Sequence, residues 1–210
     1  MRAALFDLDG TLLDSLGVWA DIDRAFLNAR EHAVPPDYTS SIRGLSFRQT
    51  AEYTKQRFGL CESVEEIMEI WHFMCERAYV GEVRLKSGAE AYLKKLKQAG
   101  VLLGVVTTLT PRLYEPALKR NGVLDLFDTF ATTDETGQDK QSGKVYQLAA
   151  QRLGLESPQC TVYEDLRQGL AGAKKCGMRT VLVYDPHNAD TFEQSRTLAD
   201  EIIMDYRECI

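Results

Sequence analysis

Four short runs of apolar and β-branched residues interrupt the chain, and each ends at a polar or acidic residue. They are Ala3–Phe6, Val101–Val106, Thr161–Tyr163 and Thr180–Tyr184, with a weaker fifth run at Thr129–Ala131. Hydrophobicity within the runs is continuous rather than alternating, which is typical of strands that are covered on both faces. The pattern therefore predicts the strands of a buried parallel sheet.

Helical patterns with recognisable ends separate the later runs. Ser87 and Glu90 have the spacing of a capping box, and Gly100 closes the apolar stripe that follows them. Further stripes close at Gly122, Gly154 and Gly177. Strand alternating with helix over residues 84–210 predicts an α/β fold with a doubly wound parallel sheet.

The segment 15–83 differs, because it carries helical patterns and no convincing strand. Two of its helices begin at capping boxes, which pair Ser46 with Gln49 and Ser63 with Glu66. We therefore expect a helical subdomain inserted after the first strand. The expected division is a core of residues 1–14 and 84–210 and a helical cap of residues 15–83.

Composition and charge narrow the possible partners. Acidic residues outnumber basic ones by 31 to 25, so no basic surplus exists to neutralise a phosphate backbone, and we expect no nucleic-acid partner. Five cysteines without a CxxC pair indicate reduced thiols rather than a disulfide framework. No signal peptide is recognisable and no apolar stretch approaches the ~18 residues of a membrane span, so we expect a cytoplasmic protein with no membrane partner.

Acidic residues directly follow two of the predicted strands. The segment Asp7–Thr11, with the sequence DLDGT, comes after the first, and Glu164 and Asp165 come after a later one. The carboxyl ends of parallel strands meet at one edge of an open α/β sheet, where such folds bind ligands. Converging carboxylates are hard to hold ionised without a cation, so the pattern favours a metal site. The alternative is that Asp165 only caps the next helix.

These residues resemble the motifs of the haloacid dehalogenase superfamily of phosphohydrolases, in family order and spacing. The motifs are DLDGTLLDS at 7–15, VVTT at 105–108, Lys140 and VYEDLRQGLAGAKKCGM at 162–178. An inserted helical cap resembles the branch of β-phosphoglucomutase and its phosphatase relatives. The resemblance covers nearly the whole chain and implies a Rossmann-like core.

The resemblance implies a role for each acid. Asp7 is the expected nucleophile, which forms an aspartyl-phosphate, and Asp9 is the expected general acid and base. The expected cofactor is Mg²⁺, which prefers oxygen ligands. Its implied ligands are the Asp7 carboxylate, the Asp9 backbone carbonyl and Asp165, with Glu164 in support.

The resemblance also implies groups that bind the transferring phosphoryl group. Thr107 is the expected hydroxyl and backbone donor, with Thr108 as a weaker candidate, although Thr107 could serve only as a β-branched strand residue. Lys140 matches the lysine that neutralises the phosphoryl oxygens. The family string KPxPDxY is replaced by KQSGKVY here, so Lys144 remains an alternative.

The cap residues expected to contact substrate are Trp19, Arg43, Gly44 and Arg48. For Trp19 the alternative is packing inside the cap, and for the two arginines it is solvation at the surface. β-Phosphoglucomutases place a histidine near position 19, so Trp19 weakens the assignment as a mutase.

The predicted function is a Mg²⁺-dependent phosphatase of a small phosphorylated metabolite, with sugar phosphates among the candidates. A phosphomutase and a non-catalytic binding protein are the alternatives. We expect a monomer or a weak homodimer.

Overall fold

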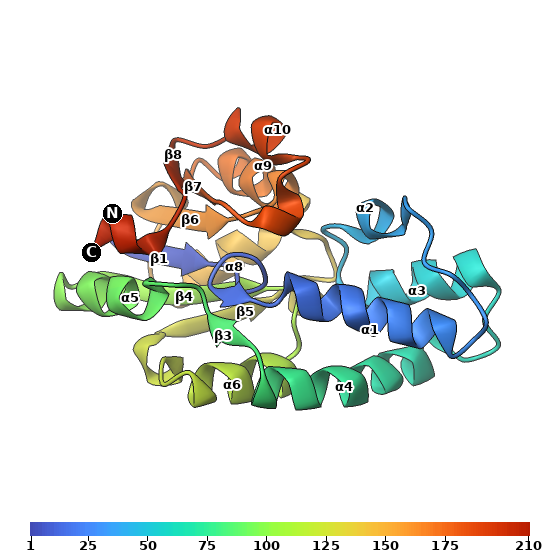
Figure 1. The fold of residues 1–210 in the computed structure, drawn as a ribbon. Helices are drawn as coiled ribbons and strands as arrows, with labels where there is room; N and C mark the ends of the chain where they lie inside the picture. Colours follow the sequence, from blue (N-terminus) through green and yellow to red (C-terminus); the bar gives the residue numbers. More distant parts are fainter.

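The computed structural model describes all residues 1–210 and contains a six-stranded parallel sheet in the order β5-β4-β1-β6-β7-β8 (Figure 1). Its strands are β1 (Ala3–Phe6), β4 (Leu102–Thr107), β5 (Thr129–Thr132), β6 (Cys160–Glu164), β7 (Arg179–Val183) and β8 (Glu201–Ile203). This confirms the predicted α/β class and parallel sheet. Since β1 lies between β4 and β6, its carboxyl end is flanked by the ends of both neighbours.

Helices cover both faces of the sheet. They are α5 (Ala89–Gln98), α6 (Pro111–Arg120), α8 (Lys144–Arg152) and α9 (Arg167–Lys175), with the short α7 (Thr133–Thr136) and α10 (Phe192–Arg196) near the strand ends. Successive β1 side chains alternate between two buried clusters, Ala4 and Phe6 in one and Ala3 and Leu5 in the other. Burial on both faces explains why the strand sequences are continuously apolar.

The helical cap lies beyond one end of the sheet (Figure 1). It consists of α1 (Leu16–Asn28), α2 (Tyr38–Ile42), α3 (Phe47–Phe58) and α4 (Val64–Gly81), between the antiparallel strands β2 (Leu13–Asp14) and β3 (Arg84–Leu85). Capping boxes begin α3 at Ser46 and α4 at Ser63, as predicted. Aromatic side chains fill the cap interior, where Trp71 packs edge-on against Phe26 and Phe47.

The predicted capping box at Ser87 and Glu90 is wrong. The residue that precedes α5 is Gly88, and no side chain caps the helix, while the Glu90 carboxylate pairs with Lys94 at 2.6 Å. Gly88 has a φ of +80°, and a Cβ there would lie 2.6 Å from the backbone nitrogen of Arg207. Close packing against the C-terminal segment therefore requires glycine at position 88, and this residue does not serve as a side-chain cap. No helix combines the length and apolar character that a bilayer crossing requires.

Candidate active site

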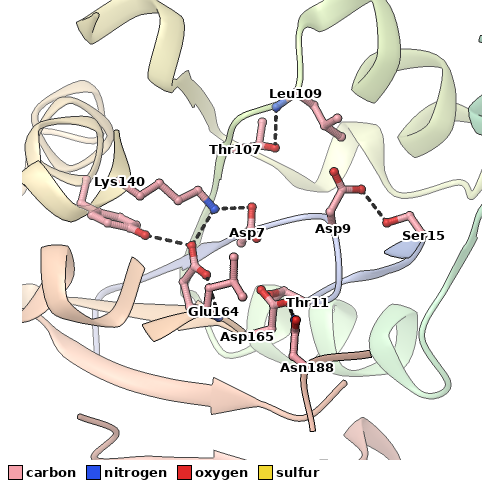
Figure 2. Close-up of polar contacts among 12 residues, drawn as sticks. Asp7, Asp9, Thr11, Ser15, Thr107, Leu109, Lys140, Glu164, Asp165 and Asn188 are labelled. Carbon is pink, nitrogen blue, oxygen red and sulfur yellow. Dashed lines mark hydrogen bonds and ion pairs between the residues drawn. The ribbon is translucent and has the colours of Figure 1, made fainter. Parts of the chain in front are cut away.

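The carboxyl ends of β1 and β6 bring Asp7 and Glu164 together around one ammonium group (Figure 2). Lys140 Nζ lies 2.5 Å from Asp7 Oδ1 and 2.6 Å from Glu164 Oε1, and all three side chains are buried. Tyr146 of α8 donates a hydrogen bond of 2.9 Å to the same Glu164 oxygen. Asp7 Oδ2 receives no hydrogen bond from the protein, so this oxygen is free to meet a ligand.

Lys140 reaches this cluster from the 3₁₀ segment Lys140–Ser142, which packs directly on α9. A Cβ on Gly172 would lie 1.9 Å from the Lys140 carbonyl oxygen, so only glycine permits this approach. Lys144, the alternative considered from the sequence, is exposed on α8. The structure therefore brings Lys140, and not Lys144, to Asp7.

Asp165 completes a buried acidic group with Asp7 and Glu164, in which the three carboxylates each offer an oxygen within 4.8 Å of the others. Thr11 donates to Asp165 Oδ1 at 3.3 Å and Asn188 donates to Oδ2 at 2.6 Å (Figure 2). Asn188 follows β7, so the strand-end argument that indicated the acids also points to its position. The sequence does not indicate Asn188, because a single uncharged residue beyond the strand end forms no recognisable pattern.

The electrostatics of the group fit a divalent cation. Burial raises the pKa of Asp7 to about 8, with Lys140 opposing the shift and Glu164 adding to it. Burial, and then repulsion from Glu164 and Asp7, raise the pKa of Asp165 well above its ordinary value. Burial opposes the charge of Lys140, but the two carboxylates raise its pKa above the usual range. One ammonium does not balance three buried carboxylates, and an all-oxygen donor set suits a hard cation.

Asp9 points away from this group, toward the cap. Its carboxylate accepts hydrogen bonds from Ser15 Oγ at 2.5 Å, Tyr79 Oη at 2.5 Å and Trp19 Nε1 at 3.2 Å. Burial raises the pKa of Asp9, and the three hydrogen bonds act against this rise. Trp19 and Tyr79 belong to α1 and α4, so two cap helices hold the side chain that the sequence assigns to proton transfer.

Thr107 and Thr108 lie differently with respect to the cavity. The Thr107 side chain is buried, and its hydroxyl accepts a hydrogen bond of 3.1 Å from the Leu109 backbone N–H. Thr108 lines the cavity beside Asp7 and Lys140. The structure thus places the weaker of the two sequence candidates on the cavity wall.

A cavity of about 290 Å³ separates the acidic group from the cap. Its core side includes Asp7, Asp9, Lys140 and Asp165, and its cap side includes Trp19, Asp23, Arg43, Gly44 and Trp71. Its size suits a small ligand. The backbone of the Arg43–Gly44 loop rests on α9, where Gln168 Nε2 donates to the Arg43 carbonyl oxygen at 3.5 Å.

The two predicted cap arginines take different positions. Arg43 lines the cavity and contacts Asp190 and Thr191 near α10 at 3.5 and 3.2 Å. Arg48 is not among the residues lining the cavity, and its guanidinium pairs with Glu65 at 3.0 Å on the cap surface. Arg43 is therefore the arginine that can reach a ligand in this arrangement.

Asp23 is a cavity residue that the sequence did not indicate. Asp23 lies on α1 and only 8% of the residue is exposed. This burial raises the pKa of its carboxyl group to about 7. Burial is the cause of this shift, and no neighbouring cation lowers the pKa again. The signal that could have found it is an acid on the otherwise apolar stripe of α1.

We expect Asp23→Asn to stabilise the protein increasingly as pH rises. An aspartate with a pKa near 7 in the folded state and near 3.8 in the unfolded state lowers the stability of the protein as pH rises from 3.8 to 7. The full loss is about 4 kcal/mol. The variant lacks this loss, so the difference in unfolding free energy between variant and wild type widens by about 2.6 kcal/mol from pH 5 to pH 8. Urea unfolding at both pH values measures it.

The matched control is Asp21→Asn, an exposed position on the same helix that pairs with Arg24. Its difference from wild type should stay constant between pH 5 and pH 8. Asp7, Asp9 and Asp165 titrate in all three proteins, so their contributions cancel. A constant difference for Asp23→Asn would contradict the raised pKa of Asp23.

Comparison with known proteins agrees with this geometry. The family model described as haloacid dehalogenase-like hydrolase matches residues 4–183. Validoxylamine A 7'-phosphate phosphatase of Streptomyces hygroscopicus subsp. limoneus is 32% identical over 209 residues, covering 96% of this chain and 94% of that protein. Hexitol phosphatase A of Escherichia coli (strain K12) is 30% identical over 192 residues, covering 90% and 85%.

Solved structures share the fold. The crystal structure of CbbY from Rhodobacter sphaeroides in complex with phosphate has a TM-score of 0.86 at 21% identity, covering 99% of this chain and 96% of that one. β-Phosphoglucomutase from Clostridium difficile has a TM-score of 0.83 at 16% identity, covering 100% and 93%. The chain therefore shares its fold with CbbY and β-phosphoglucomutase and belongs to the haloacid dehalogenase-like hydrolases.

Proposed function

We propose that this hydrolase removes phosphate from a small phosphorylated metabolite of the sugar or polyol type, with Asp7 as nucleophile and Mg²⁺ as cofactor. The observation that carries the proposal is the contact of Lys140 with both Asp7 and Glu164 beneath a cavity closed by the cap. The family and its relatives make the chain a phosphatase of the haloacid dehalogenase type. Relatives named for a hexitol and for phosphorylated carbohydrates support the substrate class.

The cation would be held by the carboxylates of Asp7 and Asp165, with Glu164 beside them and the Asp9 backbone carbonyl as a further ligand. Bound there, Mg²⁺ supplies positive charge that neutralises the phosphoryl oxygens and the attacking carboxylate. Thr11 and Asn188 hold the two Asp165 oxygens and so fix the orientation of that carboxylate. Residues that orient a ligand in this way commonly tune metal affinity.

The chemistry runs in two transfers between this chain and the ester. An Asp7 oxygen attacks phosphorus as the P–O bond to the organic group breaks, and Asp9 gives its proton to the departing oxygen. Asp9 then takes a proton from water as that water attacks the aspartyl-phosphate, which releases inorganic phosphate and restores Asp7. The rise in the pKa of Asp9 on burial favours the protonated form that the first transfer requires.

Lys140 and the cap assist both transfers. The Lys140 ammonium is fixed by two carboxylates, so it faces the phosphoryl group without having to reorganise during reaction. Thr108 lines the same cavity and Thr107 lies behind it, and both are proposed to bind phosphoryl oxygens. Apolar cap residues such as Leu45 and Phe47 line the same cavity and limit the water beside these charges, which strengthens their interactions.

Removal of the metal should abolish activity. We expect phosphate release from a panel of sugar, polyol, nucleotide and aryl phosphates to fall by at least about 100-fold when a chelator replaces Mg²⁺, because several kcal/mol of charge neutralisation are lost. Adding Mg²⁺ back should restore the rate. Turnover that is unaffected by the chelator, or no turnover of any ester with Mg²⁺, would overturn the proposal.

The same panel separates hydrolysis from phosphomutase activity. A mutase requires priming by a bisphosphate and interconverts sugar-phosphate isomers faster than it releases phosphate. We expect phosphate release without priming. Faster isomer interconversion would replace the hydrolase proposal with the mutase.

A further inference from the structure

Asp23 lies on the cavity wall at some distance from the reacting groups. It follows Trp19 by four residues on α1, and Trp19 Nε1 lies 3.2 Å from the Asp9 carboxylate. One helical turn separates positions four residues apart, which is about 5–6 Å along the axis. Asp23 therefore faces the part of a ligand that lies beyond the phosphoryl group and its ester oxygen.

The carboxylate of Asp23 has no partner in the protein. Its side chain takes part in no hydrogen bond and no ion pair. The residue is 92% buried, and the surface that its carboxylate keeps opens onto the cavity. A carboxylate that is largely withdrawn from bulk solvent and has no protein partner costs free energy. Asp23 lines the cavity, so a ligand is the group that can supply the missing hydrogen.

Trp71 is a second unsatisfied group on the same wall. Its Nε1 is buried and donates to no acceptor in the protein, and the residue lines the cavity from α4. Two other polar cap residues that line the cavity are already engaged: Thr50 Oγ1 donates to the Ser46 carbonyl oxygen at 3.0 Å, and Arg43 contacts Thr191. The cap side of the cavity thus holds an acceptor without a donor and a donor without an acceptor.

We propose that Asp23 is a specificity-determining residue that accepts a hydrogen bond from a hydroxyl group on the organic part of the substrate. A hydroxyl group both donates and accepts, so hydroxyl groups can satisfy both Asp23 and Trp71, whereas an ammonium group can only donate. The enzyme is therefore selective for phosphate esters of polyhydroxylated molecules over alkyl esters of equal length. This inference rests on the proposed function and adds the residue that selects the substrate.

Substrate preference in an isosteric series tests the inference. With wild-type protein, Asp23→Leu and Asp23→Asn, we would compare kcat/KM for a hexitol phosphate and for n-hexyl phosphate at pH 8. Asp23→Leu should lower the value for the hexitol phosphate by about 10- to 100-fold, as expected for loss of a hydrogen bond to a charged acceptor, and leave hexyl phosphate unchanged. For the hexitol phosphate, kcat/KM of Asp23→Asn should lie between the values of wild type and Asp23→Leu, because the amide oxygen still accepts a hydrogen bond.

A binding measurement keeps the inference separate from the proposed chemistry. Titration calorimetry of hexitol phosphate with Asp7→Asn and with Asp7→Asn/Asp23→Leu, both with Mg²⁺, requires no turnover. We expect the second substitution to weaken binding by about 10-fold or more. If wild-type protein hydrolyses no ester but this weakening is found, the phosphatase proposal fails and the role of Asp23 stands.

The charge-matched control is Asp21→Asn, on the exposed side of the same helix, which should change neither preference nor binding. Equal effects of Asp23→Leu on the two esters would overturn the inference. So would equal binding of hexitol phosphate by the single and double variants, or no binding by Asp7→Asn at millimolar concentration.

Discussion

Asp7→Asn is expected to lower kcat for an aryl phosphate by on the order of 10⁵-fold, with the fold intact. An amide is not a competent nucleophile for phosphorus, so the covalent route closes altogether. The substitution removes a buried carboxylate whose pKa burial has raised to about 8, and Lys140 keeps its contact with Glu164 at 2.6 Å. The Lys140 ammonium keeps a carboxylate partner and the buried group loses one of its three acids, so we expect little loss of stability.

Initial rates with 4-nitrophenyl phosphate, together with circular dichroism and thermal unfolding, measure both parts of this prediction. Asp21→Asn again serves as the control, with unchanged rate. Rapid quenching after mixing with labelled substrate should trap phosphate on the wild-type protein and none on Asp7→Asn. Activity above about 1% of wild type would require another nucleophile, and a biological effect that survives in an inactive Asp7→Asn protein would favour the non-catalytic alternative.

The buried strands could be predicted from the sequence because burial on both faces requires an unbroken run of apolar residues. Ala3, Ala4, Leu5 and Phe6 of β1 are all fully buried, so polar residues are absent until the strand ends at Asp7. The edge strand β8 has no such apolar run, since it has three residues and begins at the exposed Glu201. Helices of four or five residues, such as α2, α7 and α10, are too short to show a period.

The acidic group could be predicted because strand ends in a parallel sheet converge. Asp7 and Asp165 come from adjacent strands, so their proximity follows from topology. Lys140 begins a short 3₁₀ segment that follows no strand directly, and only its resemblance to the family lysine indicated it. The structure supplies the physical reason for its position, which is the close approach of α9 that Gly172 permits.

The cap contacts could not be predicted, because they depend on how helices distant in sequence pack. Tyr79 reaches Asp9 across 70 positions, and no local pattern encodes that contact. The sequence also gave equal weight to Arg43 and Arg48, although only Arg43 lines the cavity. Trp19 packs edge-on against Phe47, as the alternative considered for it requires, and it also lines the cavity and donates to Asp9. Its contact with substrate stays a prediction.

Asp9→Asn should separate the two proton transfers. We expect kcat/KM for an alkyl phosphate to fall by about 10²–10⁴-fold, because its departing oxygen needs a proton from Asp9. The loss should be smaller for 4-nitrophenyl phosphate, whose phenolate leaves without protonation. The proposed metal ligand at position 9 is the backbone carbonyl, which the substitution leaves in place, and the asparagine oxygen can still accept from Ser15 and Tyr79.

The second transfer gives this variant a distinct kinetic signature. Attack of water on the aspartyl-phosphate also relies on Asp9, so with 4-nitrophenyl phosphate the first step should outrun the second. Stopped-flow absorbance should then show a burst of nitrophenolate close to one equivalent of enzyme, followed by slow turnover, whereas Asp7→Asn should show neither phase. Equal losses for the two esters without a burst would mean that Asp9 transfers no proton, and its contacts with Trp19 and Tyr79 would then serve only to hold the cap against the core.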